Sequence, residues 1–335
     1  MGAASHTRQG FLIGVASVAL VLGACGHRSS PPDSASWRPA PSATATPSDH
    51  ASGPSQPSSS GQSSSQQPSP IVVPSGVSVG FAVFDRSTGS FTAQRQATQR
   101  FRSASLVKLL IALDYLWERG PGYSVATADR GRFDLMLRSS DDNAASYFYQ
   151  SDGREQSVRR MITRLGLANT AAPPTGRGWG TAAFSAIDVV RIYRYVLDEA
   201  PTPVRELVMG DLHQSTHCGT DHYDQSFGIP SAFGRPWAAK QGWYGFGDTP
   251  ATPCTATAGW TPGSPNGLGA PRVLPALASA PDVDVPGVVL HTTGTVGAGD
   301  RVIVAVLTRF PVGTPFDRAA SQVTGLTRSL PVPGV

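Results

Sequence analysis

Residues 105–118 read SLVKLLIALDYLWE, a stretch that is apolar on nearly every helical face apart from Lys108 and Asp114. A helix that is apolar all round must be buried on all sides, so this stretch predicts a central helix. The segment Gly-Pro-Gly at 120–122 ends it, because these residues disfavour a continuing helix. The rest of the domain has to supply a core around this helix.

Strand-like segments flank the helix in the sequence. Before it, residues 77–84 read VSVGFAVF, and a turn at 85–89 lets residues 90–93 return as a second strand. After it come three further segments rich in β-branched and apolar residues: 238–243, 288–293 and 301–308. The last two flank residues 294–300, which we expect to form a glycine-rich hairpin loop.

Between the two groups of strands, residues 125–200 carry helical patterns. These patterns lie near 132–137, 156–165 and 185–197, and a final helix is expected after residue 314. The order predicts an α+β fold, in which helices flank an antiparallel β-sheet built from both chain ends and an all-α lobe is inserted. Residues 244–286, rich in Gly, Pro and Thr, are expected to be a long insertion.

The N-terminus has the pattern of an export signal. An apolar run at 11–22 follows Arg8, and it is shorter than the roughly 20 residues that a membrane span needs. The run ends in Leu-Gly-Ala before Cys25, which resembles a bacterial lipobox. This implies that a signal peptide of residues 1–24 is removed and that Cys25 is lipidated. A plain signal peptide with an incidental cysteine is the alternative.

A low-complexity segment follows the cysteine. Residues 29–70 hold 15 Ser and 9 Pro and almost no apolar side chains, so they cannot bury enough surface to offset the entropy of ordering. We therefore expect residues 25–72 to be a disordered tether and residues 73–335 to be the folded domain. We expect the protein to lie at the extracytoplasmic face of the cell membrane, attached by its lipid anchor. We also expect it to be a monomer.

Two cysteines remain after Cys25, namely Cys218 and Cys254. An even number in an exported chain predicts one disulfide between them. A zinc site is the alternative, because His213, His217 and His222 lie close to Cys218 in the sequence. Gly219 and Thr220 interrupt any helix that would align these ligands, so we expect the disulfide and no metal.

Charge argues against nucleic acid as a partner. The formal net charge is only +4, and no run of basic residues forms a stripe. The choice of basic residue is informative, because the 27 Lys and Arg residues include only two lysines, Lys108 and Lys240. Both lie in motifs that call for lysine.

Three short motifs occur in order along the chain: Ser105-Leu106-Val107-Lys108, Ser140-Asp141-Asp142 and Lys240-Gln241-Gly242. S-x-x-K, S-D-N and K-T-G are together the signature of class A β-lactamases and penicillin-binding proteins. Residues 73–333 thus resemble that superfamily, and most of all its actinobacterial lipoproteins of the LppW type, which have S-D-D and K-Q-G-W variants. The resemblance implies a serine hydrolase with no cofactor, acting on peptidoglycan peptides or β-lactams.

The residue types fit nucleophilic catalysis. A serine hydroxyl needs a base at neutral pH, and Ser105 and Lys108 are spaced to share one helical face. A buried lysine beside a second cation, here Lys240, has a lowered pKa and can accept the serine proton. By resemblance, Ser140 relays protons, and the backbone N–H groups of Ser105 and Trp243 form an oxyanion hole.

Three departures from the family pattern favour poor deacylation. Asp142 stands where the family has Asn, Gln241 stands where it has Thr, and no Asp or Glu occurs between Glu155 and Asp188. That interval covers the loop in which class A enzymes carry the Glu that activates the hydrolytic water. Asp142, Gln241, Gly242 and Trp243 remain expected substrate-binding residues. The alternative function is a degraded relative that binds a cell-wall fragment or a protein.

Two further residues invite a functional reading. Ser78 lies in a G-x-S-x-G match, but a strand rather than a helix is expected after it, so we interpret it as a strand residue. His291 lies in the apolar strand VVLHTT, where we expect a histidine satisfied by the sheet.

Overall fold

The computed structural model describes residues 71–255 and 286–335, which belong to one compact unit. The expected signal peptide, Cys25 and nearly all of the expected tether lie outside these residues, as does most of the expected insertion at 244–286. Within the described residues, no helix is both long and apolar enough to cross a membrane.

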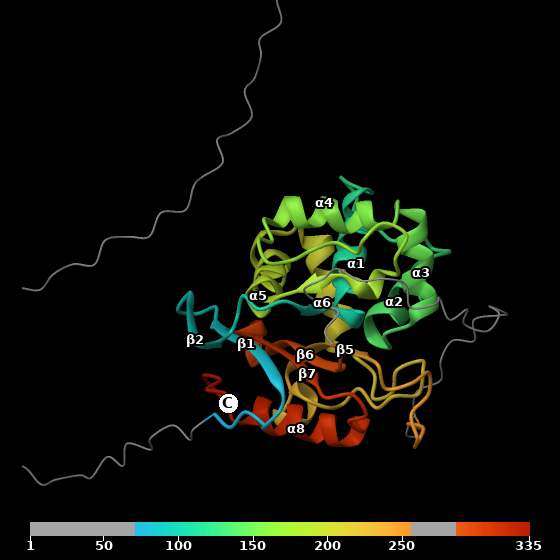
Figure 1. The fold of residues 1–335 in the computed structure, drawn as a ribbon. Coiled ribbons are helices and arrows are strands. Elements are labelled where there is room, and N and C mark those ends of the chain that lie inside the picture. The colour runs from blue at the N-terminus through green and yellow to red at the C-terminus, as the bar shows by residue number, and fades with distance from the viewer. Residues whose placement is uncertain (1–70, 256–285) are drawn as a thin grey trace, which may run out of the picture. The chain divides into compact units, whose positions relative to one another are not determined.

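A five-stranded antiparallel sheet forms the middle of this unit (Figure 1). Its spatial order is β2-β1-β7-β6-β5. The strands are β1 (Ser78–Asp85), β2 (Ser90–Arg95), β5 (Trp237–Tyr244), β6 (Val288–Val296) and β7 (Val302–Phe310). The central strands β6 and β7 are buried along almost their whole length, because both faces of the sheet are covered. The predicted α+β fold with strands from both chain ends is confirmed.

Helices lie on both faces of the sheet (Figure 1). On one face, α1 (Lys108–Trp117) is surrounded by the other helices of the inserted lobe. These are α2 (Arg130–Arg138), α3 (Asp142–Ser151), α4 (Glu155–Leu165), α5 (Ala186–Arg194), the π-helical turn η3 (Tyr195–Glu199) and α6 (Thr202–His213). On the other face lie α8 (Phe316–Arg328) and the short α7 (Ile229–Ala232).

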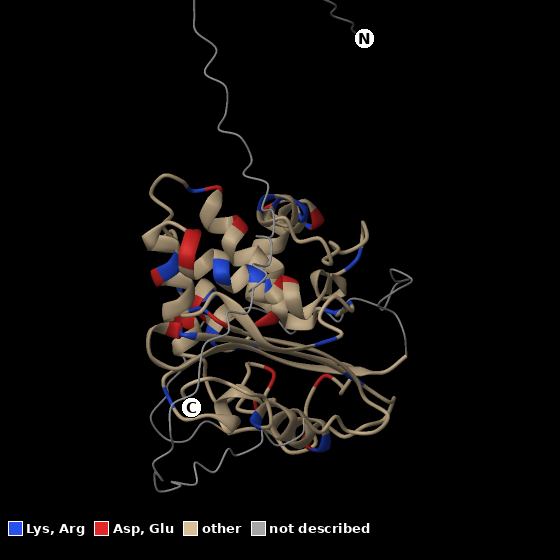
Figure 2. Ribbon diagram, turned by 90° about the vertical axis from the view of Figure 1, so that its left-hand side faces the viewer, with Lys and Arg blue, Asp and Glu red and all other residues tan. Residues whose placement is uncertain are grey.

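The central helix is buried as its sequence predicts. Residues 108–116 of α1 are all buried, and most pack in the large core between the helical layer and the sheet. The buried Asp114 is satisfied by Arg160 of α4, whose Nη2 lies 2.5 Å from Asp114 Oδ2. Charged residues are concentrated on the helices, and the strands are largely free of them (Figure 2).

The structure differs from the sequence-based expectations in several elements. Helices α3 and α6 were not expected, and residues 104–107 form a 3₁₀ turn, η1, ahead of α1. The expected hairpin loop at 294–300 is shorter, because β6 continues to Val296. Gly294 lies inside that strand, where a Cβ would be 1.9 Å from the carbonyl oxygen of Ala238, so this glycine permits close strand pairing.

Candidate active site

Ser105 lies in η1 (Ala104–Val107), between the short strand β3 (Phe101–Arg102) and α1. The turn is held by the N–H of Ser103, which donates to the carbonyl of Ala182 in 2.7 Å. Ala104 adopts a φ of 46°, a left-handed conformation that is costly for a residue with a side chain. Among the described residues the Ser105 hydroxyl has no hydrogen-bond partner, although the residue is only 6% exposed.

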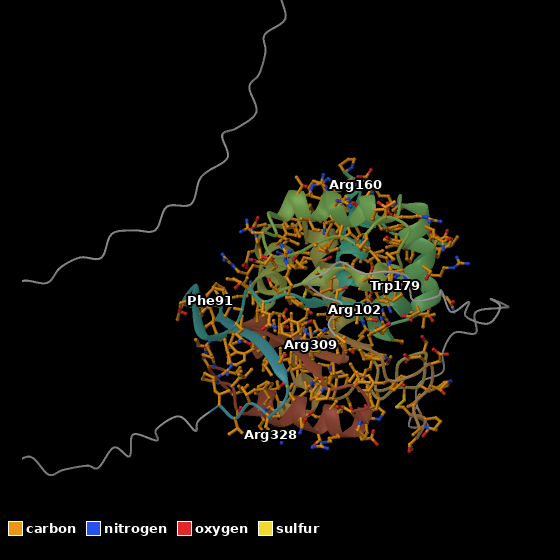
Figure 3. The ribbon with its side chains drawn as sticks, viewed as in Figure 1. Phe91, Arg102, Arg160, Trp179, Arg309 and Arg328 are labelled. Atoms are coloured by element: carbon orange, nitrogen blue, oxygen red, sulfur yellow. A yellow bond between two sulfur atoms is a disulfide. The ribbon has the colours of Figure 1, made fainter. Side chains whose placement is uncertain are left out.

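Lys108 follows one turn later and is fully buried. Its ammonium donates to the backbone carbonyl of Ser140 and lies 2.6 Å from Oδ1 of Asp142. The ring of Trp179, from the 3₁₀ turn η2 (Trp179–Thr181), covers it at 4.7 Å from Nζ to the ring centroid. Trp179 lies where the helical layer meets the sheet (Figure 3).

Lys240 reaches the same place from strand β5. Its Nζ lies 2.7 Å from Oγ of Ser140, and Lys108 Nζ lies 3.5 Å from the same oxygen. Burial, and secondarily the charge of Lys108, hold the pKa of Lys240 well below the usual value for lysine. The two lysines of the chain therefore meet at one serine hydroxyl.

Ser140 owes its position to the end of α2. The residue adopts a φ of 57°, which turns the chain between α2 and α3. The carbonyl of Arg138 accepts from the backbone N–H of Thr216 in 3.0 Å and from the side-chain amide of Gln225 in 2.6 Å. The segment after α6 thus fixes the turn that presents Ser140 to both lysines.

Asp142 is the first residue of α3, and its side chain is 65% exposed. Asp141 caps the same helix by accepting from the N–H of Ala144 in 2.6 Å. A carboxylate in the first turn of a helix is favoured by the helix dipole. This places the carboxylate of Asp142 at the solvent side of the buried Lys108 ammonium.

Gln241 and Gly242, the two residues that follow Lys240 on β5, make different kinds of contact. The side-chain amide of Gln241 donates to the carbonyls of Gln225, in 3.1 Å, and Phe227, in 2.6 Å. Within the described chain, Gln241 contacts the lysine cluster only through its backbone carbonyl, which lies 3.4 Å from Lys240 Nζ. A Cβ at Gly242 would lie 3.2 Å from the carbonyl oxygen of Ser103 and 3.4 Å from the nitrogen of Leu106. Gly242 thus lets β5 pack tightly against the turn that carries Ser105.

Trp243 forms a hydrogen bond with a carboxyl group that the sequence motifs do not predict. Its indole N–H donates to Oδ2 of Asp221 in 2.9 Å. Burial raises the pKa of Asp221, and the negative charge of Asp142 raises it further, whereas the charge of Lys108 lowers it. Asp221 therefore belongs to the same electrostatic cluster as the two lysines. Its place three residues after a disulfide cysteine was the only sequence signal.

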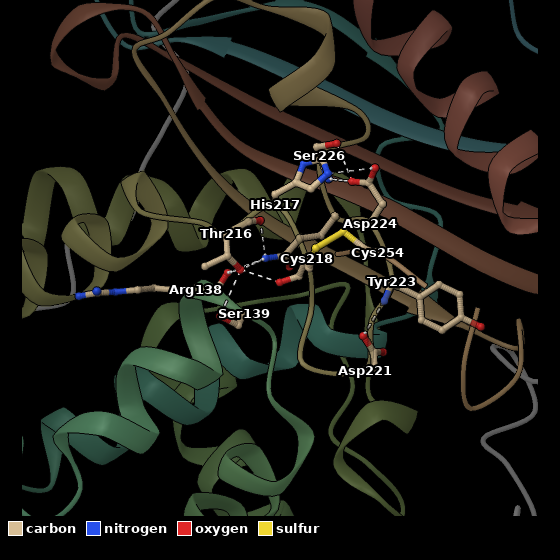
Figure 4. The surroundings of a disulfide bond; sticks show 11 residues. Arg138, Ser139, Thr216, His217, Cys218, Asp221, Tyr223, Asp224, Ser226 and Cys254 are labelled. Carbon is tan, nitrogen blue, oxygen red and sulfur yellow. Dashed lines mark hydrogen bonds and ion pairs between the residues drawn. A yellow bond between two sulfur atoms is a disulfide. The ribbon is translucent and has the colours of Figure 1, made fainter. Parts of the chain in front are cut away.

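The disulfide Cys218–Cys254 holds the loop that carries Asp221 (Figure 4). His217 lies close to the two sulfur atoms, but sulfurs joined in a disulfide are not thiolate ligands. His213 instead contacts the carbonyl of Trp237 and the carboxylate of Asp300. The zinc alternative does not fit this arrangement.

The two incidental candidates have structural partners. Ser78 begins β1 and accepts a hydrogen bond from Arg309 in 3.1 Å. His291 is fully buried, its Nδ1 accepts from the N–H of Thr308 in 3.1 Å, and its Nε2 lies 2.8 Å from the carbonyl of Arg102. The first bond requires an unprotonated Nδ1, so Nε2 carries the proton and donates it. His291 thereby ties β3, just ahead of Ser105, to the sheet.

Comparisons with known proteins give one set of relatives in sequence and another in fold. The chain is 40% identical over 173 residues to the proteins named lipoprotein LppW of Mycobacterium bovis and Mycobacterium tuberculosis. The match covers 50% of this chain and 54% of the relative, so the chain spans about half the length of the curated relatives it matches. No protein-family profile matches.

Solved structures resemble the whole described fold. A structure of the penicillin-binding protein PBP-A aligns with a TM-score of 0.53 and 13% identity, over 77% of this chain and 90% of that one. A class A β-lactamase from Mycobacterium abscessus aligns with a TM-score of 0.50 and 18% identity, over 76% and 92%. The chain thus has the fold of class A β-lactamases and penicillin-binding proteins, and in sequence it is a relative of the LppW proteins.

Proposed function

We propose that this protein is a serine acyl-enzyme of the cell envelope. Ser105 attacks an amide or ester carbonyl, as in a peptidoglycan peptide or a β-lactam, and the acyl group is then released slowly. The observation that carries this proposal is the meeting of both buried lysines at the Ser140 hydroxyl. One of these lysines, Lys108, follows Ser105 by one helical turn.

The contacts favour Lys240 as the proton acceptor, where the sequence alone favoured Lys108. The Lys108 ammonium already pairs with the Asp142 carboxylate, whereas the lowered pKa of Lys240 favours its uncharged amine. As Ser105 Oγ bonds to the carbonyl carbon, its proton passes to Ser140, whose own proton passes to Lys240. The same path returns a proton to the leaving group when its bond to the carbonyl carbon breaks.

The oxyanion of the intermediate would be stabilised by backbone N–H groups. The close packing of Gly242 against Ser103 and Leu106 brings β5 alongside the turn of Ser105. This supports the pairing of the Ser105 and Trp243 N–H groups as donors. Such fixed donors stabilise charge that develops in the transition state.

We expect slow deacylation because the interval between Glu155 and Asp188 offers no carboxylate that could activate water. No Asp or Glu lies between Glu155 and Asp188. Asp188 is itself committed, since its Oδ2 accepts from the N–H of Asn169 in 2.7 Å and from the hydroxyl of Thr170 in 2.8 Å. Because this interval supplies no carboxylate to activate water, we expect the acyl-enzyme to persist.

Intact-protein mass spectrometry tests this function. The full chain is incubated with benzylpenicillin or with a fluorophosphonate. We expect a covalent adduct that persists in the wild-type protein and in Ser78→Ala, a strand serine that serves as control, and that is absent from Ser105→Ala. An adduct that survives in Ser105→Ala would contradict the proposal.

The Lys108–Asp142 ion pair also favours a second candidate. A protein whose Lys108 is neutralised could bind a cell-wall fragment at the same residues without chemistry. This candidate predicts no adduct with either probe and a measurable heat of binding for soluble peptidoglycan fragments in titration calorimetry. An adduct on Ser105 excludes it.

Lipid anchoring at Cys25 completes the proposal. The lipoprotein name of the LppW relatives supports an anchored envelope protein, facing away from the cytoplasm. The mature protein would begin at Cys25, after loss of residues 1–24, and would act as a monomer. Mass analysis of the N-terminal peptide tests this, and a Cys25→Ala variant that stays membrane-bound would contradict it.

A further inference from the structure

We propose that the site selects acyl donors that carry no carboxylate beside the reacting carbonyl, and that it accepts neutral or cationic ones. This inference rests on the proposed acyl-enzyme function and adds its substrate class. It follows from how the lysines and carboxyl groups of the pocket are paired.

Both amines of the pocket already have partners. The Lys108 ammonium lies between the backbone carbonyl of Ser140 and the carboxylate of Asp142. Lys240 is fully enclosed, with its Nζ against Ser140 Oγ and 3.4 Å from the carbonyl of Gln241. A carboxylate on a substrate would have to displace one of these contacts to reach either amine.

Two carboxyl groups balance the two amines. The charges of Asp142 and Asp221 both act on Lys240, and those of Asp142 and Lys108 act on Asp221, so the four groups form one cluster. Their formal charges cancel when all are ionised. Burial lowers the pKa of Lys240, which removes positive charge, and raises the pKa of Asp221, which removes negative charge, so the cluster has no excess positive charge to attract an anion.

One of the two carboxyl groups is open to solvent, and the other is held in a fixed position. The side chain of Asp142 is 65% exposed, outside the buried Lys108. The carboxylate of Asp221 accepts from the indole N–H of Trp243 on β5, 2.9 Å away. It also accepts from the N–H of Tyr223, 3.3 Å away, and the two bonds fix its position (Figure 4). A donor carboxylate near both would be repelled, and an ammonium would be attracted.

Arg102 is a further cation near the turn of Ser105, and its guanidinium stacks on the ring of Tyr244 at 4.1 Å. If Arg102 recruited substrate carboxylates, anionic donors would react at least as fast as neutral ones. The test below distinguishes this outcome from the one we propose.

Three forms of one β-lactam provide the test. Benzylpenicillin, its methyl ester and its diethylaminoethyl ester share the reactive ring and carry a negative, no and a positive charge. Rates of adduct formation on Ser105 are measured with the full chain by intact mass. We expect both esters to label about tenfold faster than the acid. Equal or faster labelling by the acid would overturn the inference while leaving the proposed function standing.

The series is repeated with fluorophosphonates whose tails end in a carboxylate, an amide or a trimethylammonium group, so that a pocket closed to penicillins is still examined. The same order of rates is expected, and the reverse order overturns the inference. No adduct with any probe overturns the proposed function, and the inference falls with it. A failed inference therefore gives the reverse order of rates, whereas a failed proposed function gives no adduct.

Two variants test whether the carboxyl groups of Asp142 and Asp221 cause the preference for donors without a carboxylate. Asp221→Asn keeps an acceptor for the Trp243 indole, and Asp142→Asn keeps the start of α3 polar. Each is expected to shift the ratio of acid to ester labelling roughly threefold toward the acid. Asp224→Asn, an exposed carboxylate on the same loop, is the matched control and should leave the ratio unchanged. A ratio that is unchanged in both test variants would contradict the assignment.

Discussion

The Lys108 ammonium lies 2.6 Å from the Asp142 carboxylate, in an ion pair whose basic partner is fully buried and whose acidic partner is 65% exposed. The family pattern has an uncharged Asn at this position, so the pair is specific to chains with the S-D-D form of the motif. Because the carboxylate neutralises one of two lysines beside the candidate nucleophile, it controls how much positive charge the site offers.

Replacing Asp142 by Asn should speed acylation. The change removes the charge that holds Lys108, and we expect labelling of Ser105 to become about three- to tenfold faster. The free energy of unfolding should fall by about 1–3 kcal/mol, because the fully buried Lys108 loses its charged partner. Stopped incubations followed by intact mass give the rate.

The control for this variant is Asp134→Asn, which removes another ion-paired carboxylate, 2.7 Å from Arg130 on α2. It should label at the wild-type rate. Slower labelling of Asp142→Asn would mean that the carboxylate helps to position Lys108 for the reaction.

The pH dependence of labelling should report Lys240. A base must be uncharged, so the rate should rise as pH increases through its pKa and then level off. Because burial and Lys108 lower the pKa of Lys240, the midpoint should fall well below the usual lysine value of about 10.4. Lys240→Arg should label at least about 100-fold more slowly, since arginine stays protonated. A midpoint that persists in Lys240→Arg would assign the titration to another group.

His291 should make the protein less stable in mild acid. Burial lowers the pKa of His291 to about 4, so the folded protein binds fewer protons than the unfolded chain between about pH 6.5 and 4. Stability is therefore lost as pH falls through this window, by up to about 3 kcal/mol. Urea unfolding at several pH values should show this loss in the wild-type protein and not in His291→Gln. His217→Gln, with a half-exposed histidine, is the control and should behave like wild type.

Reduction of the disulfide should loosen the loop of Asp221. Cys218 and Cys254 are 36 residues apart, and closing such a loop stabilises the folded state by about 3–4 kcal/mol in the chain-entropy description. We expect a reductant to lower the Tm of the wild-type protein. The double variant Cys218→Ser/Cys254→Ser should have the lower Tm already and should not respond to the reductant. An equal response of both proteins would show that the effect lies elsewhere.

The motifs led to Lys108, Ser140 and Lys240, which the structure brings together, because motifs act through residue type and order. Ser105 and Lys108 lie one turn apart, in η1 and at the start of α1, Ser140 follows α2 and Lys240 lies on β5, so the four residues come from three places in the structure. Each motif contains one or two of them. The buried character of α1 and the strands at both chain ends likewise follow from apolar patterns that span many residues.

Individual side-chain contacts could not be predicted in this way. Helix α3 was missed because its sequence, DNAASYFYQS, has a polar start and only four buried residues. The pairing of Asp142 with Lys108 depends on that helix. Asp221 reaches the site through a disulfide and an indole hydrogen bond, which are contacts between segments far apart in the chain. The hydrogen bonds from the side-chain amide of Gln241 to the carbonyls of Gln225 and Phe227 likewise depend on tertiary packing.

Peptide mapping of the adduct tests the central claim most directly. After labelling with benzylpenicillin or a fluorophosphonate, the protein is digested and the modified residue is located by tandem mass spectrometry. We expect one modified residue, Ser105, and loss of modification in Lys240→Arg. An adduct on Ser140 or another serine, or no adduct with either probe, would contradict the account.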